Sequence, residues 1–385
     1  MTRMDRIPFN LPSMVGRELE YIVEAVHGGH LAGDGVFTRR CQQWLEEQCG
    51  AHKVLLAHSC TAALEMAALL CDAGPGDEVI LPSFTFVSTA NAFVLRGATP
   101  VFVDIRPDTL NLDERLIEEA ITPRTRAIVP VHYAGVSCDM DAITAIAARH
   151  GLRVIEDAAQ ALGSTYRGRG LGTIGDLGCW SFHETKNFIS GEGGALVIRD
   201  PGLVERAEIL REKGTDRSKF FRGQVDKYTW VDVGSSYLPS ELVAAYLFAQ
   251  LEHAQEILAK RRALFARYYA GLVSLQDEGL LRLPVVPPDC EPNGHLFYVL
   301  LKNEETRDAL LAHLSANGVN AVFHYVPLHE SPVGRAVGRV SGALTHTEST
   351  SRRLLRLPCY YSLTEGEQDE VMDLLRRFFM MRQRP

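Results

Sequence analysis

Short apolar runs alternate with amphipathic stretches over the first two thirds of the chain. Seven runs are predicted to be strands, at 53–57, 78–82, 100–105, 126–132, 152–157, 178–183 and 194–199. Apolar residues at helical spacing lie between most of them, at 60–72, 86–96, 114–121 and 139–150. Strands separated by helices of this length are typical of a mostly parallel, seven-stranded α/β sheet with flanking helices. Such a sheet binds ligands where its strands end, so residues just after the strands are the first site candidates.

The pattern changes near residue 238. Pro239 begins a long helical run, 239–275. It is followed by a strand at 295–301, a helix at 304–316, a strand at 319–325, a loop rich in His, Pro and Gly, and a helix at 364–380. We therefore expect a large domain over 1–238 and a smaller C-terminal α+β domain over 239–385.

Composition and charge exclude several classes of protein. The 385 residues are 46% apolar and 23% charged, and their net charge of −8 argues against non-specific nucleic-acid binding. No run of eighteen apolar residues predicts a membrane span, and the first residues show no secretion signal. The eight scattered cysteines contain no CxxC pair, which indicates reduced thiols and a cytoplasmic protein.

Lys186 is the first candidate for covalent chemistry. It is one of only seven lysines, and it lies between a short apolar strand and a glycine-rich turn. Burial at such a strand end lowers the pKa of a lysine and favours the free amine, which forms Schiff bases. The alternative is a lysine that reaches the surface from the strand end, and this segment alone does not decide between them.

Asp157 ends the predicted strand 152–157 and offers a carboxylate at the same edge of the sheet. It is either a helix cap for the residues that follow or the partner of a protonated pyridine nitrogen. Gln160, three residues on, lies near the same ring if the turn is helical, and is otherwise an exposed polar residue.

A phosphate site is predicted where the helix 60–72 begins. Ser59, Cys60 and Thr61 leave backbone N–H groups free there, and Ser181 adds a hydroxyl. An ordinary Ser/Thr cap explains the first three equally well. Phe84 and Phe86 follow the strand 78–82 and either stack on a planar ring or pack in the core.

Taken together, these groups fit pyridoxal 5′-phosphate (PLP) better than any other cofactor. The glycines at 168, 170 and 172 neither follow a strand nor open a helix, so a dinucleotide site is not indicated. The thirteen histidines show no metal-ligand spacing, and no metal site is expected.

The chain resembles the sugar-nucleotide aminotransferases of the DegT/StrS group, which have the aspartate aminotransferase-like (fold-type I) PLP fold. The resemblance rests on IPFNLPS (7–13), SCTAALEMAALL (59–70), GDEVILPSFTFVSTANAFVLRGATPVFVDI (76–105), IVPVHYAG (128–135), VIEDAAQALGSTYRGRGLG (154–172), SFHETKN (181–187), GEGGAL (191–196), FHYVPLH (323–329) and LPCYYSLTEGE (357–367). It implies a PLP-dependent transaminase that uses L-glutamate and a nucleotide sugar, in a homodimer or higher homo-oligomer.

The resemblance also implies roles for single residues. Lys186 is then the Schiff-base lysine, Asp157 the partner of the ring nitrogen and Gln160 a contact on the hydroxyl side of the ring. Phe86 is the stacking aromatic, Thr61, Ala62 and Ser181 contact the phosphate, and His324 faces the substrate. Many family members have G-x-N-x-R after the lysine segment, where the asparagine reaches the partner subunit's cofactor. This chain has Ser236 and Leu238 at those places, so Ser236 is expected to offer at most one hydrogen bond.

With Ser236 and Leu238 at these places, the segments 181–187 and 211–240 are similar to those of one branch of the family. That branch makes dTDP-4-amino-4,6-dideoxygalactose from dTDP-4-keto-6-deoxyglucose, for surface polysaccharides such as enterobacterial common antigen. Related enzymes that act at C3 or give the equatorial C4 amine stay open as alternatives. A sugar dehydratase is disfavoured, because those family members have histidine at the place of Lys186. A non-catalytic binding protein with this fold is disfavoured by the intact site residues. Arg222 is a candidate for holding the glutamate carboxylate.

Overall fold

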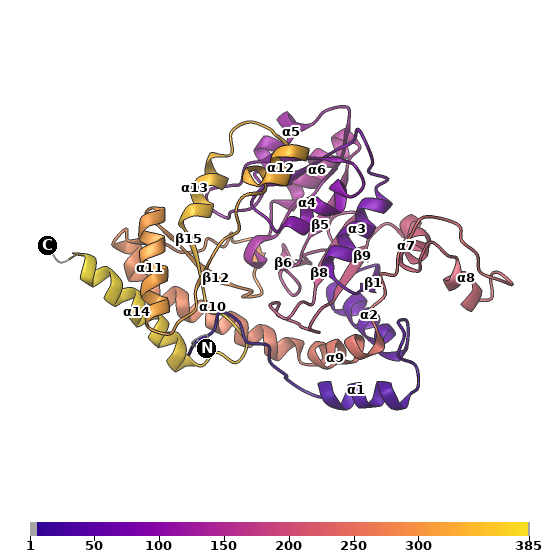
Figure 1. The fold of residues 1–385 in the computed structure, drawn as a ribbon, viewed down its shortest axis with the longest axis horizontal. Coiled ribbons are helices and arrows are strands. Elements are labelled where there is room, and N and C mark those ends of the chain that lie inside the picture. The colour runs from indigo at the N-terminus through magenta and orange to yellow at the C-terminus, as the bar shows by residue number, and fades with distance from the viewer. Residues whose placement is uncertain (1–5, 384–385) are drawn as a thin grey trace.

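The computed structural model describes residues 6–383, and its centre is an eight-stranded sheet (Figure 1). The strand order is β1 (Lys53–Ala57), β9 (Gly194–Ile198), β8 (Leu177–Ser181), β5 (Arg153–Asp157), β4 (Thr125–Ile128), β2 (Glu78–Pro82), β3 (Thr99–Val103), β14 (Arg339–Val340). All seven predicted strands are present, and the two-residue β14 from the C-terminal part adds an eighth. Only β9 is antiparallel to its neighbours. The strands β1, β2, β5 and β8 therefore end at one edge of the sheet.

Each strand buries side chains on both faces. Leu55 packs with α3 (Cys60–Leu70), α4 (Val87–Val94) and α7 (Val204–Arg211), whereas Leu56 packs with the helices of the opposite face. These are α1 (Glu18–His27), α2 (Val36–Cys49), α5 (Ile117–Ala120), α6 (Met140–His150) and α9 (Glu241–Glu252). This two-sided burial is what near-continuous apolar strands require.

The C-terminal part has its own antiparallel sheet and apolar core. The sheet order is β10 (Leu281–Arg282), β12 (Phe297–Leu301), β15 (Leu354–Leu357), β13 (Val322–Phe323). It packs on α10 (Ala254–Asp277), α11 (Glu304–Ala316), α13 (Thr345–Arg353) and α14 (Glu365–Gln383). The apolar cluster of the first part continues into α9 and the start of α10, so a domain boundary at 238/239 stays a prediction.

Several smaller elements were not predicted. They include the three-stranded sheet of β6 (Thr165–Tyr166), β7 (Arg169–Gly170) and β11 (Cys290–Glu291), and the 3-10 turns Tyr133–Gly135, Pro201–Leu203 and Leu328–Glu330. The segment expected to be a loop before the last helix also contains α12 (Pro332–Val337), α13 and β15. The helical stretch expected at 114–121 is a 3-10 turn, Glu114–Leu116, followed by α5. The single helix expected over 239–275 is wrong. It is broken between α9 and α10 at His253, whose backbone is not helical (φ −99°, ψ 17°).

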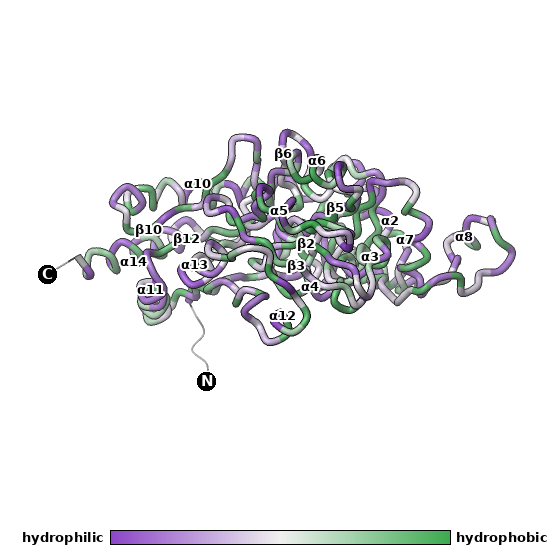
Figure 2. The backbone as a smooth tube through the Cα atoms, turned by 90° about the horizontal axis from the view of Figure 1, so that it is seen from above, coloured by the Kyte–Doolittle hydropathy of each residue, from purple (hydrophilic) through white to green (hydrophobic). Residues whose placement is uncertain are grey.

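Residues 212–236 form an arm that carries α8 (Arg217–Phe221). The arm projects from the body at the end opposite α14 (Figures 1 and 2). Isolated bridges join its two sides at Glu212–Ser236 and Thr215–Trp230. Its exposed apolar side chains are those of Phe220, Phe221, Tyr228, Trp230, Val231 and Val233. Apolar surface of this kind marks an interaction site.

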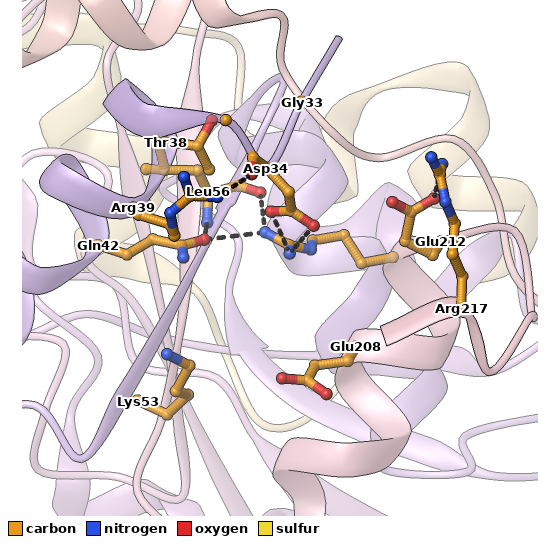
Figure 3. Close-up of polar contacts among 12 residues, drawn as sticks. Gly33, Asp34, Thr38, Arg39, Gln42, Lys53, Leu56, Glu208, Glu212 and Arg217 are labelled. Atoms are coloured by element: carbon orange, nitrogen blue, oxygen red, sulfur yellow. Dashed lines mark hydrogen bonds and ion pairs between the residues drawn. The ribbon is translucent and has the colours of Figure 1, made fainter. Parts of the chain in front are cut away.

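A buried arginine anchors the base of the arm. Arg211, the last residue of α7, donates to both carboxylate oxygens of Asp34 (2.6 and 2.8 Å), to Gln42 Oε1 (2.9 Å) and to the carbonyl oxygen of Leu56 (3.3 Å) (Figure 3). These bonds tie the arm to the loop before α2 and to β1.

Two further observations concern the whole described chain. All eight cysteines are free thiols. Within residues 6–383, no helix has the length and apolar character that crossing a membrane requires.

Candidate active site

A cavity of about 400 Å³ lies at the edge where β1, β2, β5 and β8 end. The predicted residues that line it are Thr61, Phe86, Asp157, Gln160, Ser181, Lys186 and His324. Phe84, Tyr133 and Tyr325 complete its aromatic wall. Residues that are far apart in the sequence, such as Thr61 and His324, therefore meet in one cavity.

Lys186 lies in a turn five residues after β8, and its backbone is held on both sides. The N–H of Lys186 donates to the carbonyl oxygen of His183 (2.8 Å), and the carbonyl oxygen of Lys186 accepts from the side chain of Arg261 in α10 (3.2 Å). Burial lowers the pKa of its ammonium group below the ordinary 10.5. Lys53, Lys213 and Lys219 instead form ion pairs with Glu46, Glu212 and Glu205. Lys186 is half-buried and lines the cavity, and within residues 6–383 it has no such ion pair, so it is not a surface lysine.

Asp157 points into the cavity from the last position of β5. Its Oδ2 accepts from Thr89 Oγ1 (2.6 Å), and its Oδ1 accepts from the N–H of Ala159 (3.2 Å). Thr89 has one hydroxyl proton and gives it to Asp157, so Thr85, 2.8 Å away, donates to Thr89. The site therefore contains a hydroxyl chain, Thr85 to Thr89 to Asp157, which the sequence analysis missed.

The neighbouring Glu156 points to the other face of the sheet, as strand alternation requires. It accepts from the backbone N–H groups of Gly172, Ile174 and Gly175 and bonds to His132 (2.9 Å). This carboxylate fixes the loop before β8, so of the two neighbouring carboxylates Asp157 is the one that faces the cavity.

Gln160 and Phe86 line the cavity with free groups. The carbonyl oxygen of the Gln160 side chain accepts from the N–H of Ala134 (2.7 Å), which leaves its NH₂ group for a ligand. The ring of Phe86 is 52% exposed and lies 5.3 Å from that of Tyr325. Phe84, by contrast, is buried against His324, so Phe86 is the ring that is free to stack on a planar ligand.

The start of α3 forms a compact anion cradle. Ser59 caps the helix by accepting from the N–H of Ala62 (3.0 Å), and its carbonyl oxygen accepts from Ala63 (3.2 Å). Among the described residues, the N–H groups of Cys60 and Thr61 have no acceptor. Two N–H groups at a helix N-terminus fit a phosphate.

Gly194 allows the β8–β9 pair to approach this cradle. A Cβ at Gly194 would lie 2.3 Å from the backbone of Ser59 and Cys60. Since Ser181 is the register partner of Gly194, its hydroxyl group lies beside the helix start. The cavity therefore has groups that fit PLP: an anion cradle for its phosphate, a carboxylate that could pair with its ring nitrogen, and a free aromatic ring that could stack on it.

Three expected contacts are placed differently. Ala62 is buried and its N–H is used by Ser59, so it does not line the cavity. Ser236 is exposed on the returning side of the arm, outside the cavity. Arg222 bonds to Glu208 (2.8 Å) beside the arm, so its expected role at the glutamate carboxylate has no support within one chain. Spacing alone could not show where the arm goes.

Known proteins give independent evidence. Residues 12–376 match the DegT/DnrJ/EryC1/StrS aminotransferase family. The chain is 41% identical over 318 residues to the dTDP-3-amino-3,4,6-trideoxy-alpha-D-glucose transaminase of Streptomyces venezuelae (82% of this chain, 80% of the relative). It is 35% identical over 383 residues to the GDP-perosamine synthase of Caulobacter vibrioides (97% and 99%).

The fold is shared with solved aminotransferases. The PLP-form of the sugar aminotransferase Spr1654 from Streptococcus pneumoniae is 26% identical and has a TM-score of 0.89, over 97% of this chain and 99% of that one. The expected aminotransferase fold and activity class are thereby confirmed. The chain belongs to the DegT/DnrJ/EryC1/StrS aminotransferase family.

Proposed function

We propose that the protein is a PLP-dependent transaminase that moves the amino group of L-glutamate to a keto group of a nucleotide-linked deoxysugar. The observation that carries the proposal is one cavity that joins the buried amine of Lys186, the carboxylate of Asp157 and the anion cradle of α3. Two relatives support the substrate class, because one is named as a transaminase of a dTDP-linked 3-amino sugar and the other as a GDP-perosamine synthase. When bound, PLP accepts the electron pair released as the amino donor loses its Cα proton.

The residues of this chain divide that work. Cys60, Thr61 and Ser181 bind the phosphate, and Phe86 stacks on the ring. Asp157 accepts a hydrogen bond from the ring nitrogen and favours its protonated form. Gln160 donates its free NH₂ group to an oxygen on the ring.

Lys186 moves the protons. Because burial lowers its pKa, a larger share of the amine is free to take the Cα proton of the amino donor. In the second half of the reaction it returns a proton to the sugar carbon that receives the amine. The carbonyl contact from Arg261 holds the lysine backbone during both steps.

We also propose a homodimer in the cytoplasm. The exposed apolar groups of the arm, with Trp230 at 77% and Phe221 at 70% exposure, favour a protein partner. A second copy that covers the arm would bring Ser236 near the partner's cavity. A monomer in light scattering at micromolar concentration would contradict this.

Two sugar substrates are proposed for the same site. The motifs around 181–187 and 211–240 favour dTDP-4-keto-6-deoxyglucose, with dTDP-4-amino-4,6-dideoxygalactose as the product. The 41% identity to an enzyme named for a 3-amino sugar favours a C3 keto sugar as the second candidate.

Product analysis decides between them. The protein, PLP and L-glutamate are incubated with each keto sugar nucleotide, and the product is examined by proton NMR. Small ring couplings at the carbon that bears the amine identify an axial C4 amine and the galacto product. Large couplings identify the equatorial C4 amine, and reaction with only the 3-keto sugar supports the second candidate. No amine with any of these sugars would contradict the proposed function.

A further inference from the structure

A buried guanidinium group without a counter-ion lies behind the cavity. Arg356 is in the middle of β15, between Tyr298 and Val322 in register, and is 6% exposed. No carboxylate in residues 6–383 forms an ion pair with it; its hydrogen bonds go to Tyr133 Oη (3.1 Å, from Nε) and to His324 Nδ1 (2.6 Å, from Nη2). A buried charge with only neutral partners is costly, so this arrangement needs an explanation.

Arg356 fixes the tautomer of His324. An arginine side chain only donates hydrogen bonds, so Nδ1 of His324 must accept and cannot carry a proton. The neutral ring therefore has its proton on Nε2. Burial and, next, the charge of Arg356 lower the pKa of His324 well below its ordinary value, in agreement with a neutral ring.

The Nε2–H group of His324 has no partner. The ring lies 3.6 Å from that of Phe84, stacked, and meets Tyr133 edge-on at 5.3 Å. It lines the cavity with Lys186, yet its Nε2 makes no hydrogen bond within the described residues. A rigidly held, buried donor of this kind is suited to an oxygen atom of a bound reactant.

We infer that Arg356 is a positioning residue that fixes His324 as an Nε2–H donor, and that this donor binds a carboxylate of the amino donor. The inference rests on the proposed function. The carboxylate is bonded to the same carbon that loses its proton to Lys186, so it must lie close to that amine. Burial first, and the charge of Arg356 as a smaller cause, lower the pKa of Lys186. Arg356 therefore adds positive charge beside the amine, which favours a carboxylate over a neutral sugar carbonyl.

The first test needs neither turnover nor cofactor. The full-length chain with ¹⁵N-labelled histidine is examined by NMR, with and without PLP, and His324→Gln identifies the signal. We expect an Nε2–H tautomer whose proton signal shifts when glutarate, a dicarboxylate without an amine, is added. A proton on Nδ1, or a signal that glutarate leaves unchanged, overturns the inference.

Arginine variants separate positioning from a general structural role. Arg356→Met should weaken glutarate binding about 10- to 100-fold, the loss expected for a charge-assisted hydrogen bond. Arg356→Gln keeps a donor to Nδ1 of His324 and should restore part of the glutarate affinity. Arg282→Met, a half-buried arginine of the same small sheet that does not line the cavity, is the matched control and should bind as wild type. If the methionine variant does not fold, the glutamine variant decides.

The two half-reactions identify the source of the carboxylate. Each half-reaction is followed separately in single turnovers. In Arg356→Met, the L-glutamate concentration that gives half the maximal rate should rise about 10- to 100-fold, whereas the corresponding keto-sugar concentration should rise less than about 3-fold. Equal losses in both, or a loss only with the sugar, overturn the inference. Glutarate binding that depends on Arg356, without transamination of any keto sugar, supports it and contradicts the proposed function.

Discussion

The hydroxyl chain behind Asp157 is expected to control the chemistry of the bound cofactor. Thr89→Val keeps the shape of a fully buried side chain and removes the 2.6 Å hydrogen bond to Asp157 Oδ2. It also removes the acceptor for the hydroxyl of Thr85. The donor stabilises the charged carboxylate, so its loss should weaken the interaction of Asp157 with a protonated ring nitrogen.

The size of the effect follows from the charge on the acceptor. A hydrogen bond to a charged group contributes about 1.5–3 kcal/mol. At about 1.4 kcal/mol per factor of ten, this corresponds to a fall in kcat/KM of about 10- to 100-fold. Thr85→Val breaks only a bond between two neutral hydroxyl groups, about 0.5–1.5 kcal/mol, and should cost at most about 10-fold. Thr89→Ser retains the donor.

The assay is kcat/KM for transamination, together with a pH titration of the visible absorption of bound PLP. We expect the order wild type, Thr89→Ser, Thr85→Val, Thr89→Val, from most to least active. Wild-type activity in Thr89→Val, or equal losses in the two valine variants, would refute the reasoning.

Three further predictions concern stability and cofactor binding. In Gly194→Ala the new Cβ meets backbone at 2.3 Å, so we expect a lower Tm, a loss of about 1–3 kcal/mol and weaker PLP binding; unchanged Tm and affinity would contradict the cradle. Burial lowers the pKa of Lys186 in the folded protein below the 10.5 of the unfolded chain. Between these two pKa values the unfolded chain binds more protons, so the free energy of unfolding rises with pH by up to about 1.4 kcal/mol per pH unit. Urea unfolding of the PLP-free protein should show a shallower rise in Lys186→Met, and equal slopes would show that the amine is not buried. Asp34→Asn should lower the free energy of unfolding by about 1–3 kcal/mol, less than for a fully buried pair because Asp34 is about one-third exposed; identical denaturation curves would contradict an anchoring role at Arg211.

The sequence predicted best what local patterns determine. All seven central strands formed, and the helix expected at 304–316 has those limits in α11. Lys186, Asp157, Ser181 and Phe86 were found because each lies at a strand end or a few residues after one, where a parallel sheet gathers its ligands. The break at His253 was missed, because apolar spacing continues through it and only the packing of α9 on α1 and α2 requires the turn.

Other residues depend on contacts between distant segments. Thr89 is an ordinary helix residue until β5 brings Asp157 beside it, 68 positions away in sequence. Arg356 is one arginine among 33 in the sequence, and only the pairing of β15 with β12 and β13 places it behind His324. Ala62 was assigned to the phosphate site because the motif did not show that Ser59 uses its N–H.

The most direct test of the account is chemical trapping of the lysine. The protein is loaded with PLP, reduced with borohydride, digested and examined by mass spectrometry. The account predicts one phosphopyridoxyl group on Lys186 and none on the other six lysines, and Lys186→Ala should still bind PLP but show neither the label nor transamination. A label on another lysine, or an unlabelled but active protein, would contradict it.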